Sequence, residues 1–149
     1  MKVAILMGSV KDSDKMQPAS DVLSTFGIEH EVHVMSAHRT PQRVAEFASA
    51  ARDNGYGALL CGAGEAALLA GAVAAHSDLP VIGVPIAAGK LGGMDALLST
   101  VQMPTGIPVA TVAVDSSANA AYLAAAILSL LDSQVATDLA AYRESLKGD

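Results

Sequence analysis

Residues 3–27 read VAILMGSVKDSDKMQPASDVLSTFG, an apolar run followed by a short glycine-led loop and a segment with helical composition. The run Val3–Gly8 has the length and apolar character of a buried strand, and Ser13–Thr25 is predicted as a helix that ends near Gly27. A buried strand that leads directly into a helix is the first half of a βαβ unit. This stretch therefore indicates a parallel sheet covered by helices.

The rest of the chain repeats this alternation. Further strands are expected over Glu31–Met35, Ala58–Cys61, Pro80–Pro85 and Pro108–Val114. Further helices are expected from Thr40-Pro41 to about Asn54-Gly55, and over Glu65–His76, Met94–Thr100, Ser116–Leu131 and Ser133–Lys147. Thr40 is predicted as the capping residue of the first of these, with proline in the first helical position. The pattern predicts an α/β fold with three layers, flavodoxin-like or Rossmann-like, over residues 1–149 as a single domain.

The composition is unusually apolar for a chain of this size. Hydrophobic residues make up 52% of its 149 residues, charged residues 16%, and the mean hydropathy is +0.41. Disorder is excluded by this hydrophobicity, and the longest apolar run, near Ala120–Leu131, is well short of the roughly 20 residues that span a bilayer. A small domain has much surface to cover, so we expect an oligomer. The Ala-rich helices predicted over Glu65–His76 and Ser116–Leu131 are the first candidates for subunit contacts.

Charge and cysteine content exclude several classes of partner. The net charge of −6 disfavours nucleic acid, because binding to phosphate chains needs a basic surface. Aromatic residues are 3% with no Trp, so a stacking platform for bases or a flavin ring is not expected. Cys61 is the only cysteine and cannot form an internal disulfide, which fits a reducing cytoplasm. The N-terminus has no pattern of a secretory signal, so the cytoplasm is the expected location.

Four loops are expected at the carboxyl ends of the strands, where open parallel sheets bind ligands. They are Gly8–Asp12, Ser36–Pro41, Gly62–Glu65 and Ile86–Met94. The first is a candidate anion site, because backbone N–H groups at a helix start attract phosphate and Lys11 adds a positive charge. A simple capped turn is the alternative interpretation of that loop.

The loop Ser36-Ala37-His38-Arg39-Thr40-Pro41 is the most informative of the four. Histidine titrates near neutral pH and can both give and take a proton, and Arg39 beside it can form a fork of hydrogen bonds to a phosphate or carboxylate. A capping histidine with a surface arginine is the alternative. The other histidines, His30, His33 and His76, belong to predicted strand and helix positions and are interpreted as structural.

Other motifs are weaker. The run GAGEAA at residues 62–67 imitates a dinucleotide-binding fingerprint, but it follows the third strand rather than the first and lacks a suitably placed acidic residue. Ser9 is not in a nucleophile elbow, and Cys61 ends an apolar strand and is expected to be buried and inert. The spacing of His, Cys and carboxylates predicts no metal site. The segment 92–109, rich in Gly, Pro and Met, suits an active-site flap or a subunit contact.

Several blocks in order resemble the bacterial N5-carboxyaminoimidazole ribonucleotide mutase family of purine biosynthesis, class I, also called the phosphoribosylaminoimidazole carboxylase catalytic subunit. The resemblance covers nearly the whole chain. Its carriers are Met7-Gly8-Ser9 with Asp12 and Met16, SAHRTP at 36–41, GAG at 62–64, PVIGVP at 80–85, DALLS at 95–99, VQMP at 101–104 and GIPV at 106–109. It implies a flavodoxin-like sheet with helices on both faces, assembled as a homo-octamer, with its C-terminal helices (about 116–147) in oligomer contacts.

The resemblance also implies an activity and its residues. The family is an isomerase that moves a carboxylate from the exocyclic nitrogen of an aminoimidazole ribonucleotide to ring carbon 4, without a metal or organic cofactor. It places the general acid/base on His38. Substrate binding is expected from a set at the strand ends: Ser9, Asp12, Arg39, Gly8, Ser36, Ala63 and Gly64.

Four positions depart from the family pattern. Lys11 stands where the family has Ser, and Glu65, Leu68 and Ala70 stand where it has Gly, His and Pro. We expect Lys11 and Glu65 to be paired across the site, since they introduce opposite charges. The alternatives to the mutase are a carboxylase that uses free CO2, a non-catalytic nucleotide-binding paralogue, and a flavin- or NAD-binding protein. An intact His38 argues against the paralogue, and the poor aromatic content argues against flavin.

Overall fold

The structure is a computed structural model and describes residues 1–148. Its strands are β1 (Lys2–Met7), β2 (His30–Val34), β3 (Tyr56–Gly64), β4 (Val81–Ile86) and β5 (Ala110–Thr111). Its helices are α1 (Ser13–Thr25), α2 (Pro41–Ala50), α3 (Leu69–His76), α4 (Met94–Val101), α5 (Ser117–Leu128) and α6 (Ser133–Ser145), with short 3-10 turns η1 (Val10–Asp12) and η2 (Leu146–Gly148). The predicted alternation of strands and helices is confirmed.

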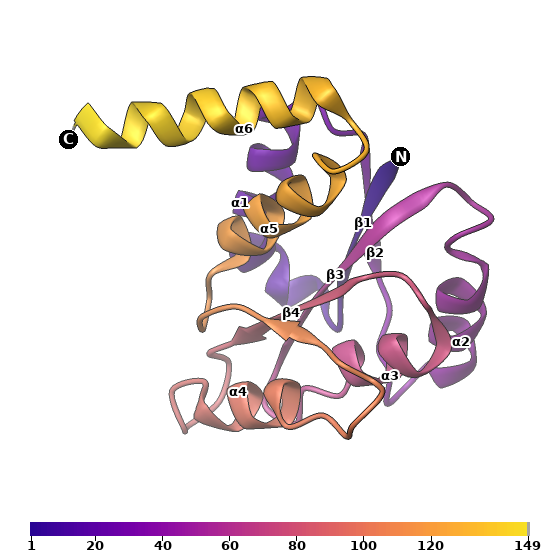
Figure 1. Ribbon diagram of the computed structural model, residues 1–149. Coiled ribbons are helices and arrows are strands. Elements are labelled where there is room, and N and C mark those ends of the chain that lie inside the picture. Colours follow the sequence, from indigo (N-terminus) through magenta and orange to yellow (C-terminus); the bar gives the residue numbers. More distant parts are fainter. Residues whose placement is uncertain (149) are drawn as a thin grey trace.

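The five strands form one parallel sheet in the order β2-β1-β3-β4-β5 (Figure 1). This is the flavodoxin-like order, in which the chain turns back at β1 and β3, so the fold class predicted from the sequence is confirmed. Helices α1, α5 and α6 lie on one side of the sheet, and α2, α3 and α4 lie on the other (Figure 1). The carboxyl ends of β1, β2, β3 and β4 therefore open onto one edge.

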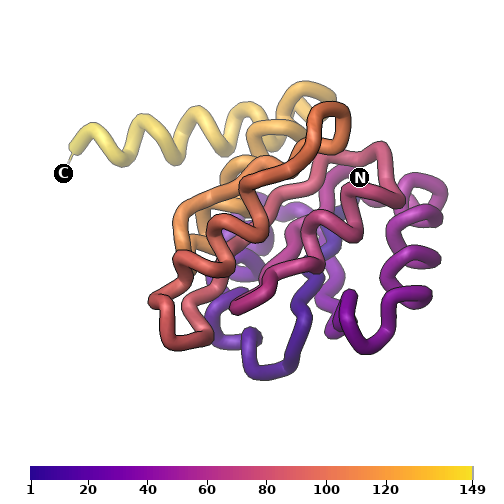
Figure 2. The backbone as a smooth tube through the Cα atoms, turned by 90° about the horizontal axis from the view of Figure 1, so that it is seen from below, coloured from indigo at the N-terminus to yellow at the C-terminus, as the bar shows by residue number. Residues whose placement is uncertain are grey.

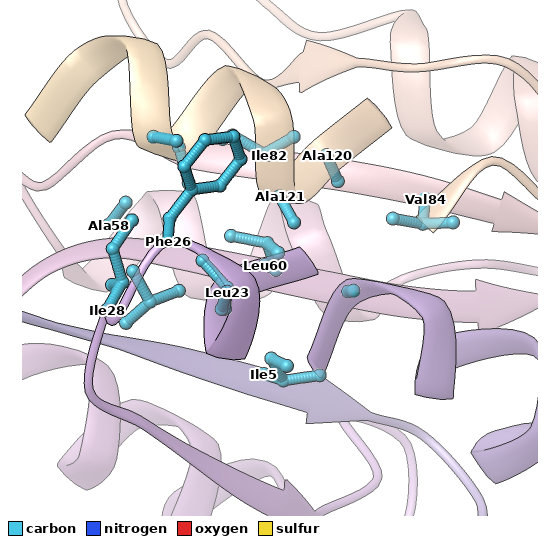
Figure 3. Packing of buried hydrophobic residues seen from close by; sticks show 14 of the residues in the cluster. Ile5, Leu23, Phe26, Ile28, Ala58, Leu60, Ile82, Val84, Ala120 and Ala121 are labelled. Carbon is cyan, nitrogen blue, oxygen red and sulfur yellow. The ribbon is translucent and has the colours of Figure 1, made fainter. Parts of the chain in front are cut away.

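Two apolar clusters hold the layers together, one on each face of the sheet. Alternate β1 residues divide between them: Ile5 faces α1 and α5, whereas Leu6 faces α2 and α3. Figure 3 shows the first cluster, to which Leu23 and Phe26 of the α1 region, Leu60 of β3 and Ala121 of α5 all contribute. Alanines 120, 121, 124 and 125 of α5 are fully buried, so their small side chains bring this helix close to the sheet.

The last helix extends beyond the body of the molecule. Figures 1 and 2 show α6 as a projecting rod with its C-terminal end away from the sheet. Its own side chains Val135 and Leu139 are buried against the body of the molecule, and its Tyr142 stacks on Tyr122 of α5 with ring centroids 4.6 Å apart. Phe26 meets the Tyr142 ring edge-on at 6.1 Å. A few aromatic and aliphatic contacts at the base of α6 therefore anchor it.

Several element boundaries differ from the sequence predictions. Strand β3 covers Tyr56–Gly64 rather than Ala58–Cys61, and α5 ends at Leu128 rather than Leu131. The helix expected from Glu65 begins at Leu69, because residues 65–68 form tight turns in which Ala67 N–H donates to Glu65 O at 2.9 Å and Leu68 N–H to Ala66 O at 2.7 Å. The edge strand β5 has two residues instead of seven, since it pairs only with β4. Helix α2 ends at Ala50, and a turn continues to Gly55, whose φ is +83°.

The capping role expected of Thr40 is also wrong. Thr40 occupies the N-cap position of α2, but its hydroxyl donates to Ser36 O at 2.9 Å and caps no backbone N–H of the helix.

No helix within residues 1–148 is long and apolar enough to cross a membrane.

Candidate active site

Residues of the four loops at the carboxyl ends of β1–β4 line a cavity of about 540 Å³. All eight residues predicted for the site contribute to its lining: Gly8, Ser9, Asp12, Ser36, His38, Arg39, Ala63 and Gly64. The rest of its wall comes from Lys11, Ala37, Glu65, Ala66, Leu68, Leu69 and Ala88. Residues far apart in the chain are thus brought to one place by the order of the sheet.

The loop after β1 is a capped turn at the wall of the cavity. Ser9 caps the 3-10 turn Val10–Asp12, and its Oγ accepts a hydrogen bond from Lys11 N–H at 3.2 Å. The capped-turn interpretation of this loop therefore holds, and it keeps the Ser9 hydroxyl at the cavity wall. Asp12 is 8% exposed; burial raises the pKa of its carboxyl above the ordinary value, partly offset by the Ser9 backbone.

The loop after β2 is a compact turn built on Ser36. Its carbonyl oxygen accepts from the Thr40 N–H at 2.8 Å, and its Oγ accepts from the Arg39 N–H at 3.2 Å. Arg39 reaches back across the cavity edge, where its Nη2 donates to Gly8 O at 3.3 Å. The His38 ring is exposed in the cavity, and no other side chain or backbone group of residues 1–148 hydrogen-bonds to it. Its two nitrogens are therefore available to a ligand.

The loop after β3 approaches its neighbours very closely. A Cβ on Gly64 would lie 2.5 Å from Ala88 Cβ and 3.1 Å from Ile86 O, so a larger residue there would displace the next loop. Glu65 follows with a φ of +54°, in the left-handed region that favours glycine. Its Cγ would lie 3.1 Å from a Cβ on Gly89. The side chain of Glu65 therefore packs against the loop after β4.

The predicted pairing of Lys11 with Glu65 is wrong. Both residues line the cavity, but their charged groups form no ion pair in the described part of the chain. The turn at Glu65 sends its side chain towards Gly89 in the loop after β4, which accounts for the missing contact. Two cations (Lys11 and Arg39) and two carboxylates (Asp12 and Glu65) thus share the lining as separate groups.

Some lining residues were not selected from the sequence. Leu69 and Ala88 carry no polar group, so no chemical signal marks them. Ala88 belongs to the Ile86–Met94 loop, which was expected at this edge only because it follows the fourth strand of a parallel sheet. Lys11 was expected to add a positive charge to the first loop, whereas Leu68 was noted only as a departure from a family pattern; Leu68 is 46% exposed beside the cavity.

The remaining candidate groups lie outside the cavity lining. His30 bonds to Ser20 Oγ at 2.6 Å and Ile28 O at 3.0 Å, and His33 lies near Glu31 and Tyr56. Cys61 is buried in β3, and desolvation raises the pKa of its thiol far above the usual range. No three His, Cys, Asp or Glu side chains of residues 1–148 lie together as a metal site would require.

Known proteins resemble this chain over nearly its whole length. The sequence profile of the family described as AIR carboxylase matches residues 2–149. An N5-carboxyaminoimidazole ribonucleotide mutase of Pyrococcus abyssi is 49% identical over 146 residues, which is 98% of this chain and 84% of that protein. A chloroplastic phosphoribosylaminoimidazole carboxylase of Vigna aconitifolia is 44% identical over 97% of this chain, which spans 26% of that longer protein. The crystal structure of Treponema denticola PurE superposes with a TM-score of 0.89 and 33% identity, covering 98% of this chain and 91% of the other.

Proposed function

The chain belongs to the AIR carboxylase family, and we propose that it converts N5-carboxyaminoimidazole ribonucleotide to 4-carboxy-5-aminoimidazole ribonucleotide, an isomerisation of purine biosynthesis. One observation carries this proposal: the side chains of His38, Arg39, Ser9 and Asp12 line the same cavity, next to Gly64. Relatives that share 46–49% of the sequence over 98% of the chain bear the mutase name.

The chemistry needs one group that gives and takes a proton, and His38 is that group. In the first step the carbamate C–N bond breaks, CO2 forms, and the exocyclic nitrogen keeps the electron pair and takes a proton from the His38 imidazolium. In the second step ring carbon 4 attacks CO2, and the neutral imidazole then removes the proton from carbon 4. One imidazole returns to its starting state, so atoms and charge balance over the cycle. The free ring nitrogens of His38 support this role.

The ribonucleotide is held by groups at the strand ends. Arg39, Lys11 and the backbone amides after Gly8 bind the 5′-phosphate, since cations and a helix start favour this anion. Ser9, Ser36 and Asp12 offer polar groups to the rest of the substrate, and Ala63 and Gly64 leave room for the ring. These binding roles rest on the position of each residue in the cavity lining.

A carboxylase that uses free CO2 is the second candidate, because a relative 44% identical to this chain bears a carboxylase name. The two activities are separated by incubating the protein with each carboxylated isomer without bicarbonate, and then with aminoimidazole ribonucleotide plus bicarbonate. Interconversion of the isomers without added bicarbonate supports the mutase. Product formation only in the second incubation contradicts it.

The working form is a homo-octamer in the cytoplasm, acting on a small-molecule ribonucleotide and not on nucleic acid or membranes. Helices α3 and α5 bury most of their apolar side chains within the subunit, so exposed apolar residues elsewhere are better contact candidates. Leu130 and Leu131, between α5 and α6, are 81% and 80% exposed, and Met94 and Leu98 of α4 are 55% and 50% exposed. Leu130, Leu131 and the projecting α6 (Figure 2) support subunit contacts through the C-terminal helices, and Met94 and Leu98 make α4 a further contact candidate. A monomer in light scattering at assay concentration contradicts this assembly.

A further inference from the structure

Asp115 lies in the turn between β5 and α5, outside the cavity lining, and its backbone is strained. Its φ of +58° falls in the left-handed region, a conformation that it shares only with Glu65 among the non-glycine residues described. Strained positions of this kind cost free energy and persist where surrounding contacts impose them. The contacts of Asp115 therefore need an explanation.

The carboxylate of Asp115 joins three parts of the fold. Its Oδ1 accepts a hydrogen bond from the backbone N–H of Ala87 at 3.0 Å, directly after β4. Its Oδ2 forms an ion pair with Lys15 in α1, and Ser117 Oγ of α5 donates to Lys15 O at 2.6 Å. The Asp115 N–H donates to Pro85 O at 2.8 Å, so both the backbone and the side chain of Asp115 are hydrogen-bonded to the end of β4.

The segment held by Asp115 forms one wall of the candidate site. Ala88 follows Ala87 and lines the cavity, where it meets Gly64 so closely that a Cβ on Gly64 would lie 2.5 Å from Ala88 Cβ. On its other side, a Cβ on Gly93 would lie 2.6 Å from Val114 Cγ1 and 3.3 Å from Ala87 Cβ. The start and the end of the loop after β4 are thus fitted between Gly64 and the Val114–Asp115 turn.

The carboxylate is ionised at neutral pH and so is a strong acceptor. Partial burial raises the pKa of Asp115, but hydrogen bonds from Lys15 and the Ala87 N–H outweigh burial and hold the pKa below its ordinary value. The Lys15 ion pair is partly exposed and contributes little free energy by itself. The hydrogen bond to Ala87 is therefore the contact that positions the loop.

We propose that Asp115 is a positioning residue of the active site, whose carboxylate holds Ala87 and Ala88 against Gly64 and so keeps CO2 inside the cavity between its release and its recapture. This inference rests on the proposed function. In that reaction the carbamate C–N bond breaks before carbon 4 forms its new bond, so free CO2 exists within the site. An opened wall lets this CO2 leave and lets dissolved CO2 enter in its place.

The test measures exchange of the transferred carboxylate with solution. Unlabelled N5-carboxyaminoimidazole ribonucleotide is converted in ¹³C-bicarbonate with carbonic anhydrase, and label in the 4-carboxy product is counted per turnover. Asp115→Gly suits the positive φ and removes only the side chain, and we expect label per turnover to rise about tenfold, the effect of losing one charged hydrogen bond. Asp115→Asn keeps an oxygen acceptor for Ala87 and should restore the wild-type value. Asp78→Ala, which removes an exposed, ion-paired aspartate outside the cavity lining, is the matched control.

A second readout does not depend on turnover. Amide hydrogen exchange at Ala87 should be about tenfold faster in Asp115→Gly than in the wild type and should return to the wild-type rate in Asp115→Asn. Equal label incorporation and equal Ala87 exchange in the wild type and Asp115→Gly overturn the inference. A wild-type enzyme that forms no product defeats the proposed function instead, and the Ala87 exchange then decides alone whether Asp115 holds the loop.

Discussion

Arg39 Nη2 donates a hydrogen bond to the carbonyl oxygen of Gly8 at 3.3 Å. The two residues follow β2 and β1, which are neighbours in the sheet, so this contact ties the histidine-bearing loop to the glycine-led loop. His38 is thereby held beside a cation and beside the turn capped by Ser9. The proposed acid/base group and the proposed phosphate site therefore lie on two loops that are joined to each other by this hydrogen bond.

Replacing Arg39 by methionine should weaken substrate binding. The variant loses both a cation and the contact with Gly8, and we expect KM to rise about 10- to 100-fold, since a charged hydrogen bond contributes roughly 1.5–3 kcal/mol. Steady-state kinetics measures the change. Arg43→Met, an exposed arginine of α2 outside the cavity lining, should leave KM near the wild-type value. An unchanged KM in Arg39→Met would remove Arg39 from substrate binding.

Replacing Gly64 by alanine should damage both stability and turnover. The new Cβ would lie 2.5 Å from Ala88 Cβ and 3.1 Å from Ile86 O, so the loop after β4 has to move. Overpacking of this kind costs about 1–3 kcal/mol of unfolding free energy, which a urea titration measures. Gly148→Ala, with no neighbour within 4 Å, is the control and should change neither quantity. Wild-type kcat and stability in Gly64→Ala would show that the close approach has no consequence.

The hydrogen bonds around Glu31 should make the melting temperature of the protein depend on pH in the acidic range. Hydrogen bonds from Lys2 and then Tyr56 lower the pKa of Glu31 from 4.5 to about 2. A lowered carboxyl pKa stabilises the folded state above the unfolded pKa, and this stabilisation is lost as pH falls through the folded value. The melting temperature of the wild type should therefore exceed that of Glu31→Gln at pH 7 and down to about 4.5, and the difference should shrink towards pH 2. A difference that stays constant over this range contradicts the assignment.

Removing the Tyr142 ring should loosen α6. The ring stacks on Tyr122 at 4.6 Å and meets Phe26 edge-on, and few other buried side chains anchor this helix. Tyr142→Ala should lower the unfolding free energy by about 1–3 kcal/mol, whereas Tyr142→Phe keeps the stack and should stay within about 0.5 kcal/mol. Thermal melts at one protein concentration measure both. Equal melting temperatures for the alanine variant and the wild type would show that the stack does not anchor α6.

The main features of the fold were predictable from sequence because strand and helix periods agree with the turn residues along most of the chain. The helix Ser13–Thr25 was predicted to the residue, and the loops gathered at one edge as parallel topology requires. The start of α3 was not predictable, because GEAALLAG at 64–71 favours a helix throughout and only tertiary contact imposes the positive φ of Glu65.

The candidate site was predictable where its residues carry chemistry. His38, Arg39, Ser9 and Asp12 have groups that suggest proton transfer or anion binding, and the cavity brings them together. Ala88 has no such group. Asp115 lies 28 residues away in the sequence from Ala87, whose N–H donates to its carboxylate. The error over Lys11 and Glu65 has the same origin, since side-chain direction at a strained turn is set by packing against Gly89.

The proposed mechanism assigns both proton transfers of the isomerisation to His38 in this cavity. The most direct measurement follows wild type and His38→Asn from both carboxylated isomers to equilibrium without bicarbonate, with ligand binding measured in parallel by calorimetry. The wild type should reach one equilibrium mixture from either isomer, whereas His38→Asn should bind the ribonucleotide but form no product above background. Turnover by His38→Asn at the wild-type rate would remove His38 from the mechanism.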